Sequence, residues 1–377
     1  MSVTKINLNP FPVFRIPHKM RLLPALIAAL WAGAASAVPA TKPRSCSTPN
    51  KPVLPNSFKW TSTGALIGPK DDGRNLAGIK DPTIVQVNGT YHVFASTAKS
   101  EGYNLVYLNF TSFAAASSAP FYYLDQSPIG TGYRAAPQVF YFAPQKLWYL
   151  VYQNGNAAYS TNPDINNPAG WTAPQVFYPA GMPPIIEANI GKGYWVDMWV
   201  VCDAQNCHLF SSDDNGHLYR SQTKLKDFPA GMSEPVIVME DTQNIYALWE
   251  ASLVYAVKGG KGEQKYLLVI EAIGSDSERY FRAWTSDKID GTWKALADTE
   301  ANPFARANNV VFEEGVAEWT KSISHGEAVR TNVDQRMEID PCGIKFLYQG
   351  MDPKASGGEY NALPWRLGFI TQTNSAC

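Results

Sequence analysis

The chain has 377 residues, of which 45% are hydrophobic and 12% aromatic, so one large domain with a substantial core is possible. Its 32 basic and 33 acidic residues nearly cancel, to a formal net charge of −1, which argues against a nucleic-acid or anionic-membrane partner. Only 17% of the residues are charged, while there are 11 Trp and 19 Tyr. This balance suits either an aromatic β core or a surface that stacks on neutral sugars.

The N-terminus has the features of a secretory signal peptide. A basic start at Lys19–Arg21 precedes an apolar run over Leu22–Ala35, and Ala35–Ala37 forms an A-x-A cleavage site. The residues before Met20 are an unusual extension, and Met20 is a candidate start. No other stretch is long and apolar enough to span a bilayer. We therefore predict an extracellular protein with a signal peptide and its extension at 1–37, a tail rich in Pro, Ser and Lys at 38–56, and a single domain at 57–377.

The cysteines, at positions 46, 202, 207, 342 and 377, are odd in number, so at least one is free or paired elsewhere. Cys202 and Cys207 flank a short loop, which makes a cross-strand bridge possible, and Cys46 and Cys342 could staple the tail to the last part of the fold. No C-x-x-C pair is present, which argues against a zinc or redox site. Sequons at Asn88 and Asn109 predict N-glycosylation.

Short β runs separated by turn signals follow, with almost no helical periodicity. They group into five packets of three or four strands, over 81–108, 139–161, 195–220, 251–286 and 336–371. Repeats of roughly 50 to 60 residues with four short strands each are typical of a β-propeller. We therefore predict an all-β, five-bladed propeller, with a strand at Phe58–Ile67 completing the last blade. A β-sandwich is the structural alternative.

A polar residue precedes or opens an apolar run in each packet: Asp81, Gln138, Asp197, Glu250 and His325. Strand formation does not require them, and in a propeller all five would meet at one mouth of the central funnel. Each could instead be an ordinary turn residue, as Asp before Pro often is. The recurrence favours a shared pocket.

Three of these residues are carboxylates, which together can hydrolyse a glycosidic bond. That reaction needs one protonated acid and one ionised base. Glu250 is the better candidate acid because of its longer reach and higher reference pKa. A third carboxylate beside Glu250 would hold its proton on.

Other residues near these runs have two possible roles. Trp199 shares a strand face with Asp197, and we expect it in the core. His325 could be structural, or a metal or water ligand on the axis, while Arg330 could pair with an acid in the pocket. Tyr360 and Asn361 precede the final strand and could either contact sugar hydroxyls or simply pack.

Four motifs together resemble those of glycoside hydrolase family 62, a family of secreted α-L-arabinofuranosidases that act on arabinoxylan. They are IKDPT at 79–83, VDMWVVCD at 196–203, LWEA at 248–251 and ISHGE at 323–327. The resemblance extends over about residues 46–377. It implies a five-bladed propeller and an inverting mechanism.

Carried over position by position, the resemblance implies that Asp81 is the general base, Asp197 the group that orients the sugar and modulates the pKa of the acid, and Glu250 the general acid. It also implies that His325 is a ligand of a structural calcium ion held mostly by water. The positions expected to line the arabinose pocket are Lys80, Tyr360 and Asn361, together with Arg330 and Gln138.

The sequence thus predicts a monomeric, secreted enzyme that removes α-L-arabinofuranosyl side chains from arabinoxylan. One alternative is a xylosidase or arabinanase similar to family 43, which shares the propeller and the three acids. Another is a sugar-binding propeller without catalysis. Such a lectin would not need the spaced acids.

Overall fold

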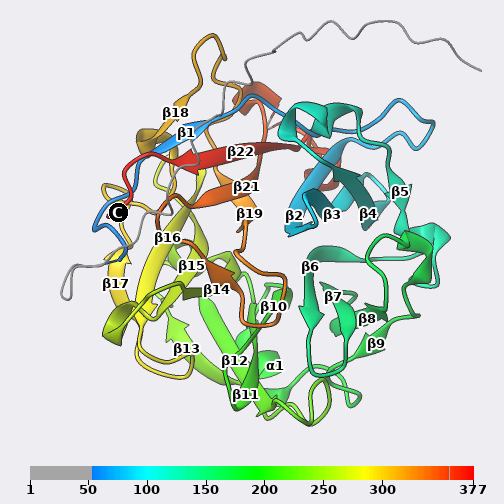
Figure 1. The fold of residues 1–377 in the computed structure, drawn as a ribbon, viewed down its shortest axis with the longest axis vertical. Coiled ribbons are helices and arrows are strands. Elements are labelled where there is room, and N and C mark those ends of the chain that lie inside the picture. Colours follow the sequence, from blue (N-terminus) through cyan, green and yellow to red (C-terminus); the bar gives the residue numbers. More distant parts are fainter. Residues whose placement is uncertain (1–52, 356) are drawn as a thin grey trace, which may run out of the picture. The chain divides into compact units, whose positions relative to one another are not determined.

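The computed structural model describes residues 53–355 and 357–377. The predicted signal peptide, most of the predicted tail and Cys46 lie outside the described residues, and so these predictions remain open. The described chain is built almost entirely of strands, arranged as five small sheets around a common centre (Figure 1). This confirms the predicted five-bladed β-propeller.

The first four blades follow one another along the chain. The first comprises β2 (Gly78–Val87), β3 (Thr90–Lys99), β4 (Gly102–Phe110) and β5 (Tyr122–Tyr123), and the second β6 (Ala135–Phe142), β7 (Leu147–Gln153), β8 (Ala157–Asn162) and β9 (Gln175–Val176). The third comprises β10 (Val196–Cys202), β11 (Asn206–Ser212), β12 (His217–Lys224) and β13 (Val236–Glu240), and the fourth β14 (Glu250–Val257), β15 (Tyr266–Ile273), β16 (Arg279–Ser286) and β17 (Lys294–Ala297). Consecutive strands in each blade are antiparallel, as short hairpin connections require.

The fifth blade joins both ends of the domain. Its order is β18 (Val310–Phe312), β1 (Trp60–Ser62), β22 (Arg366–Gln372), β21 (Lys345–Gly350) and β19 (Ser324–Ala328). β1 pairs antiparallel with β22, as predicted for the strand at Phe58–Ile67. One assignment was wrong: β20 (Glu338–Ile339), predicted within the fifth packet, pairs instead with β14 of the fourth blade.

Helices are short and lie in the connections. The α-helix α1 spans Pro184–Asn189, and the 3-10 helices are η1 (Phe113–Ser118), η2 (Leu124–Gln126), η3 (Pro168–Gly170), η4 (Ile245–Leu248), η5 (Gly262–Gln264), η6 (Ala307–Asn309), η7 (Pro353–Ala355) and η8 (Tyr360–Ala362). Within the described residues, no helix has the length and apolar character needed to cross a membrane.

The innermost strand of every blade carries an irregularity in its pairing near its start. The register shifts between Lys80 and Thr83 in β2, and at corresponding places in β6, β10, β14 and β19. In the first four blades the same position has a left-handed backbone, at Asp81, Ala136, Asp197 and Ala251, with φ between 49° and 59°. A bulge of this kind redirects a side chain out of the normal alternation.

The amide at each bulge is bonded across a blade boundary. Four of these amides donate to a side chain on the second strand of the preceding blade: Asp81 N–H to Gln349 Oε1 at 2.6 Å, Ala136 N–H to Ser96 Oγ at 2.9 Å, Asp197 N–H to Gln153 Oε1 at 2.8 Å and His325 N–H to Glu271 Oε2 at 2.6 Å. The fifth, Ala251 N–H, donates to Asp197 Oδ2 at 2.8 Å. These bonds satisfy buried donors and fix the blades' inner edges relative to one another.

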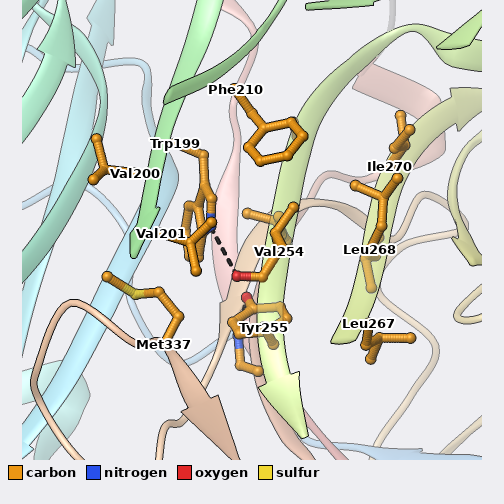
Figure 2. Packing of buried hydrophobic residues seen from close by; sticks show 14 of the residues in the cluster. Trp199, Val200, Val201, Phe210, Val254, Tyr255, Leu267, Leu268, Ile270 and Met337 are labelled. Carbon is orange, nitrogen blue, oxygen red and sulfur yellow. Dashed lines mark hydrogen bonds between the residues drawn. The ribbon is translucent and has the colours of Figure 1, made fainter. Parts of the chain in front are cut away.

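Apolar packing between blades forms the core, and Trp199 belongs to it as predicted. Its side chain lies between β10 and β14, next to Tyr255 and Val254 (Figure 2). The indole Nε1–H donates to Val254 O at 3.0 Å, so its one polar atom is satisfied inside the core.

Of the two predicted disulfides, one is confirmed and the other is wrong. Cys202 and Cys207, directly opposite on β10 and β11, form the predicted cross-strand bridge. Cys342 pairs with Cys377 and not with Cys46, because Gln372 N–H bonds to Ile344 O at 2.8 Å and so brings the C-terminal residues close to Cys342. The asparagines of both sequons, Asn88 and Asn109, are exposed.

Candidate active site

A cavity of about 850 Å³ opens where the bulges converge. Seven predicted residues line it: Lys80, Asp81, Asp197, Glu250, His325, Tyr360 and Asn361. They come from the starts of β2, β10, β14 and β19 and from η8. The structure therefore brings together residues that are up to 281 positions apart in the chain.

Lys80 and Asp81 form a buried charged pair at one wall. Their Nζ and Oδ1 atoms are 3.6 Å apart, and both side chains are 8% exposed. The ammonium also lies over the rings of Tyr103 and Tyr360 and 3.4 Å from Tyr360 Oη. Burial lowers the pKa of Lys80, but Asp81 and its other neighbours outweigh burial and hold the pKa well above its usual value. Lys80 is therefore a fixed cation.

His325 faces two of the carboxylates. Its Nδ1 atom lies 3.6 Å from Asp81 Oδ1 and 3.4 Å from Asp197 Oδ2. Burial lowers the pKa of this imidazole, yet Asp197 and Asp81 outweigh burial and raise it to about 9. In turn, the pKa of Asp197 is raised, mainly by burial, although His325 opposes that shift.

Glu250 is paired with a residue that the sequence did not suggest. Arg279, at the start of β16, contacts Glu250 Oε1 through the same Nη1 that lies 2.8 Å from Glu271 Oε1. Burial raises the pKa of Glu250, but Arg279, Lys80 and His325 together outweigh burial and lower it. We expected a third carboxylate to hold the proton on Glu250. In this structure the charges of Arg279, Lys80 and His325 act on the pKa of Glu250 in the opposite direction.

Glu271 is the second carboxylate that binds Arg279. It is fully buried, and Ser324 Oγ–H donates to its Oε1 at 2.8 Å. Burial is the main reason that the pKa of Glu271 rises to about 7. A signal for it existed in the sequence, since it is the one charged residue in the otherwise apolar run YLLVIEAI at 266–273.

Asp214 is a further carboxylate in the cavity. It follows β11 in the loop DDNG at 213–216, whose sequence resembles an ordinary turn. Burial, Glu250 and Asp197 raise the pKa of Asp214 to about 9, although Arg279 opposes them.

Two predicted sugar contacts do not reach the cavity. Gln138 lies two residues beyond the bulge residue Ala136, so it matches Thr83 of β2 and not Asp81. Its side chain bonds instead to the backbone of Val200, at 2.8 Å from Nε2 and 2.7 Å from Oε1.

Arg330, predicted to pair with an acid in the pocket, is buried below it. Its Nε lies 2.7 Å from Glu327 Oε1, and Nη2–H donates to Val139 O at 2.6 Å. Glu327 in turn accepts from the amide of Ile84 at 3.1 Å. This ion pair links β19 to β2 and β6, and so it belongs to the core.

The residues around His325 do not by themselves build a calcium shell. Calcium takes six to eight oxygen ligands, and within the described residues no group of three or more His, Cys, Asp or Glu side chains could hold a metal ion. An ion here would take nearly all its ligands from water.

A propeller whose axial cavity holds several carboxylates, some protonated and some ionised at neutral pH, is suited to acid–base cleavage of a glycosidic bond. That arrangement defines a class of glycoside hydrolases. The family model described as glycosyl hydrolase family 62 matches residues 59–371, and the chain belongs to this family.

Individual relatives agree with this assignment. The chain is 43% identical over 316 residues to "Alpha-L-arabinofuranosidase C" of Cellvibrio japonicus, covering 83% of this chain but only 47% of that relative, so it spans about half of its length. The solved catalytic domain of a GH62 alpha-L-arabinofuranosidase from Coprinopsis cinerea is 67% identical, with a TM-score of 0.83, and the match covers 86% of this chain and all of that one. A GH62 hydrolase solved in complex with xylotriose is 71% identical, with a TM-score of 0.82, covering 84% and 98% of the two chains.

Proposed function

We propose that the protein is a secreted, inverting α-L-arabinofuranosidase that removes arabinofuranosyl side chains from arabinoxylan. The observation that carries this proposal is the convergence of Asp81, Asp197 and Glu250 on one cavity, in a chain whose family relatives are arabinofuranosidases. The xylotriose bound by one close relative supports a xylan backbone as the rest of the substrate.

In this mechanism Asp81 takes a proton from water as that water attacks the anomeric carbon. Glu250 gives a proton to the xylose oxygen as the bond to arabinose breaks. Lys80 Nζ and His325 Nδ1 each lie 3.6 Å from Asp81 Oδ1, so positive charge faces the proposed base. Inversion requires Asp81 to accept a proton from water and Glu250 to carry one when the bond breaks.

The main role of Asp197 is to hold the backbone next to Glu250 in place. Its Oδ2 accepts the amide of Ala251, the residue after Glu250, at 2.8 Å, so it fixes the backbone that carries the acid. Tyr360 and Asn361, from η8 at the cavity wall, supply hydroxyl and amide groups that can bond to the arabinose hydroxyls.

Incubation with wheat arabinoxylan is the direct test. We expect free arabinose as the only released sugar and no xylose or arabinan fragments. Released xylose, or arabino-oligosaccharides from arabinan, would favour the family 43-like alternative instead. Binding to arabinoxylan without any release would favour a sugar-binding propeller.

The stereochemistry is tested separately by proton NMR during the first turnovers. Inversion gives β-arabinofuranose as the first product from the α-linked substrate. Initial accumulation of the α-anomer would reject the assignment of Asp81 as a base that activates water.

Secretion and calcium binding are further parts of the proposal. Expression of the whole chain in a fungal host should yield extracellular protein cleaved after Ala37, as N-terminal sequencing would show. Elemental analysis of that protein should find calcium in a ratio of about one per chain, and His325→Ala should lower that ratio. Intracellular retention or a metal-free protein would overturn the corresponding part.

A further inference from the structure

Glu250, the proposed general acid, needs a source for the proton that it delivers. A general acid must carry a proton when the substrate bond breaks, but Arg279 contacts Glu250 and three cations lower its pKa. Glu250 is thus ionised in this arrangement at neutral pH. Another group within hydrogen-bonding reach must therefore hold the proton.

Asp214 is in the right place to do so. It lines the same cavity as Glu250, and Glu250 is the neighbouring charge that most favours its neutral form. Its Oδ1 atom is buried, and no described residue offers it a hydrogen-bond partner. A carboxylate with an unpaired buried oxygen is costly, whereas a protonated carboxyl that donates to an ionised neighbour is not.

The loop around Asp214 is built to hold this position. The adjacent Asp213 is fully buried, and its two oxygens accept from Asn215 N–H at 2.9 Å, His217 N–H at 3.2 Å, His217 Nδ1 at 2.7 Å and Tyr219 Oη at 2.8 Å. A Cβ on Gly193 would lie 1.9 Å from the Asp213 carbonyl oxygen, so another segment packs directly on the loop. Asp214 itself has a φ of 53°, which turns it away from the regular strand direction.

We propose that Asp214 is a positioning residue that stores the proton which Glu250 delivers to the leaving oxygen. This inference rests on the proposed role of Glu250 as general acid. When the sugar bonds to Arg279 or displaces it, Glu250 loses its counter-charge and takes the proton from Asp214. Glu250 then passes that proton to the glycosidic oxygen, the C–O bond breaks, and water adds to the anomeric carbon while Asp81 takes its proton. Solvent removes the proton from Asp81 and returns one to Asp214, so one water is consumed in each cycle.

The charged groups that face Asp214 agree with this assignment. Glu250 on β14 and Asp197 on β10 both favour its neutral form, while Arg279 on β16 is the opposing charge; with burial they raise the pKa of Asp214 to about 9. Asn at this position cannot hold a proton. In that variant the alkaline limb of the pH–rate profile reports Glu250 alone, so it should move to lower pH.

The test compares Asp214→Asn with wild type on an arabinoxylan oligosaccharide and on 4-nitrophenyl α-L-arabinofuranoside. The first has a poor leaving group that needs a proton, and the second does not. We expect kcat on the oligosaccharide to fall roughly 100-fold or more, which is the usual contribution of general acid catalysis, and kcat on the aryl substrate to fall less than about tenfold. Asp241→Asn is the matched control, because Asp241 N–H bonds to Gly216 O of the same loop while its side chain accepts from Asn244 N–H.

Equal losses of kcat on both substrates, with an unchanged alkaline limb of the pH–rate profile, would overturn the proposal. A rise in KM with unchanged kcat would also overturn it, because Asp214 would then only bind sugar. Glu250→Gln separates this result from failure of the proposed function. If Glu250→Gln discriminates between the substrates and Asp214→Asn does not, only the role of Asp214 is rejected; if neither does, Glu250 is not the acid. Should Asp214→Asn not fold, the smaller Asp214→Ser provides the same two readouts.

Discussion

Replacing Arg279 with methionine would remove the one cation that contacts both Glu250 and Glu271. The side chains of Arg279 and Glu250 are 12% and 14% exposed, and that of Glu271 is 0% exposed. Breaking a buried ion pair in this way costs about 3–5 kcal/mol, because a buried charge is left uncompensated. With an unfolding entropy of about 0.7 kcal/mol/K for a domain of this size, Tm should fall by roughly 4–7 °C near pH 8.

The loss should shrink as the pH falls. Without Arg279 the folded-state pKa of Glu250 rises above its unfolded value, whereas in the wild type it lies below. The folded variant therefore binds more protons than its unfolded chain at mildly acidic pH, and its stability recovers toward pH 5.

Thermal unfolding near pH 5 and near pH 8 measures this directly. Arg306→Met is the matched control: its side chain is also 12% exposed, but its partners Asp276 and Glu300 are 49% and 38% exposed, so we expect a loss of about 1 kcal/mol or less. A loss for Arg279→Met that is no larger than this control, or that is the same at both pH values, would refute the reasoning.

Three other changes have distinct expected outcomes. Asp81→Asn should abolish arabinose release and keep the fold, because Asn tolerates the left-handed backbone at this site; a variant that no longer folds would mean that the charge is structural. His325→Gln should lower kcat for arabinose release, since a cation 3.6 Å from Asp81 and 3.4 Å from Asp197 is lost; an unchanged kcat would show that the imidazole has no part in the reaction. Replacing Cys202 and Cys207 together with Ser should cost only about 2 kcal/mol by denaturant unfolding, since the bridge closes a loop of few residues, and a loss above about 4 kcal/mol would contradict the loop-entropy argument.

The sequence predicted the fold and the inner carboxylates for one physical reason. A polar residue at the start of an apolar run breaks the alternation that a strand requires, and Asp81, Asp197 and Glu250 each do so. The same reasoning misplaced Gln138, because the bulge residue of β6 is Ala136, which carries no polar signal. The pattern identifies an irregular strand start but not which of its residues faces the axis.

Arg279 and Asp214 could not be predicted in this way. Arg279 opens an ordinary alternating strand, and Asp214 lies in a loop that has the composition of a turn. Arg279 reaches Glu250 only because β14, β15 and β16 pair in register, with Glu250 opposite Glu271. Asp214 reaches the cavity only because its loop lies beside the start of β14 in the closed propeller. Neither Arg279 nor Asp214 therefore carries a local mark of its role in the sequence, in contrast to Glu271, which is the one charge in an apolar run.

The junction between the third and fourth blades differs from the other four, and this difference couples Asp197 to Glu250. At the other four junctions a side chain from the second strand of a blade accepts the next bulge amide, as Gln153 does for Asp197. In the third blade the corresponding residue is Ser212, opposite Val196, yet the acceptor is the Asp197 carboxylate itself. The bond that closes this junction is therefore made by a group that also lines the cavity. Any change that moves Asp197 moves the backbone next to Glu250, so in this propeller the placement of the acid and the integrity of the ring depend on the same carboxylate.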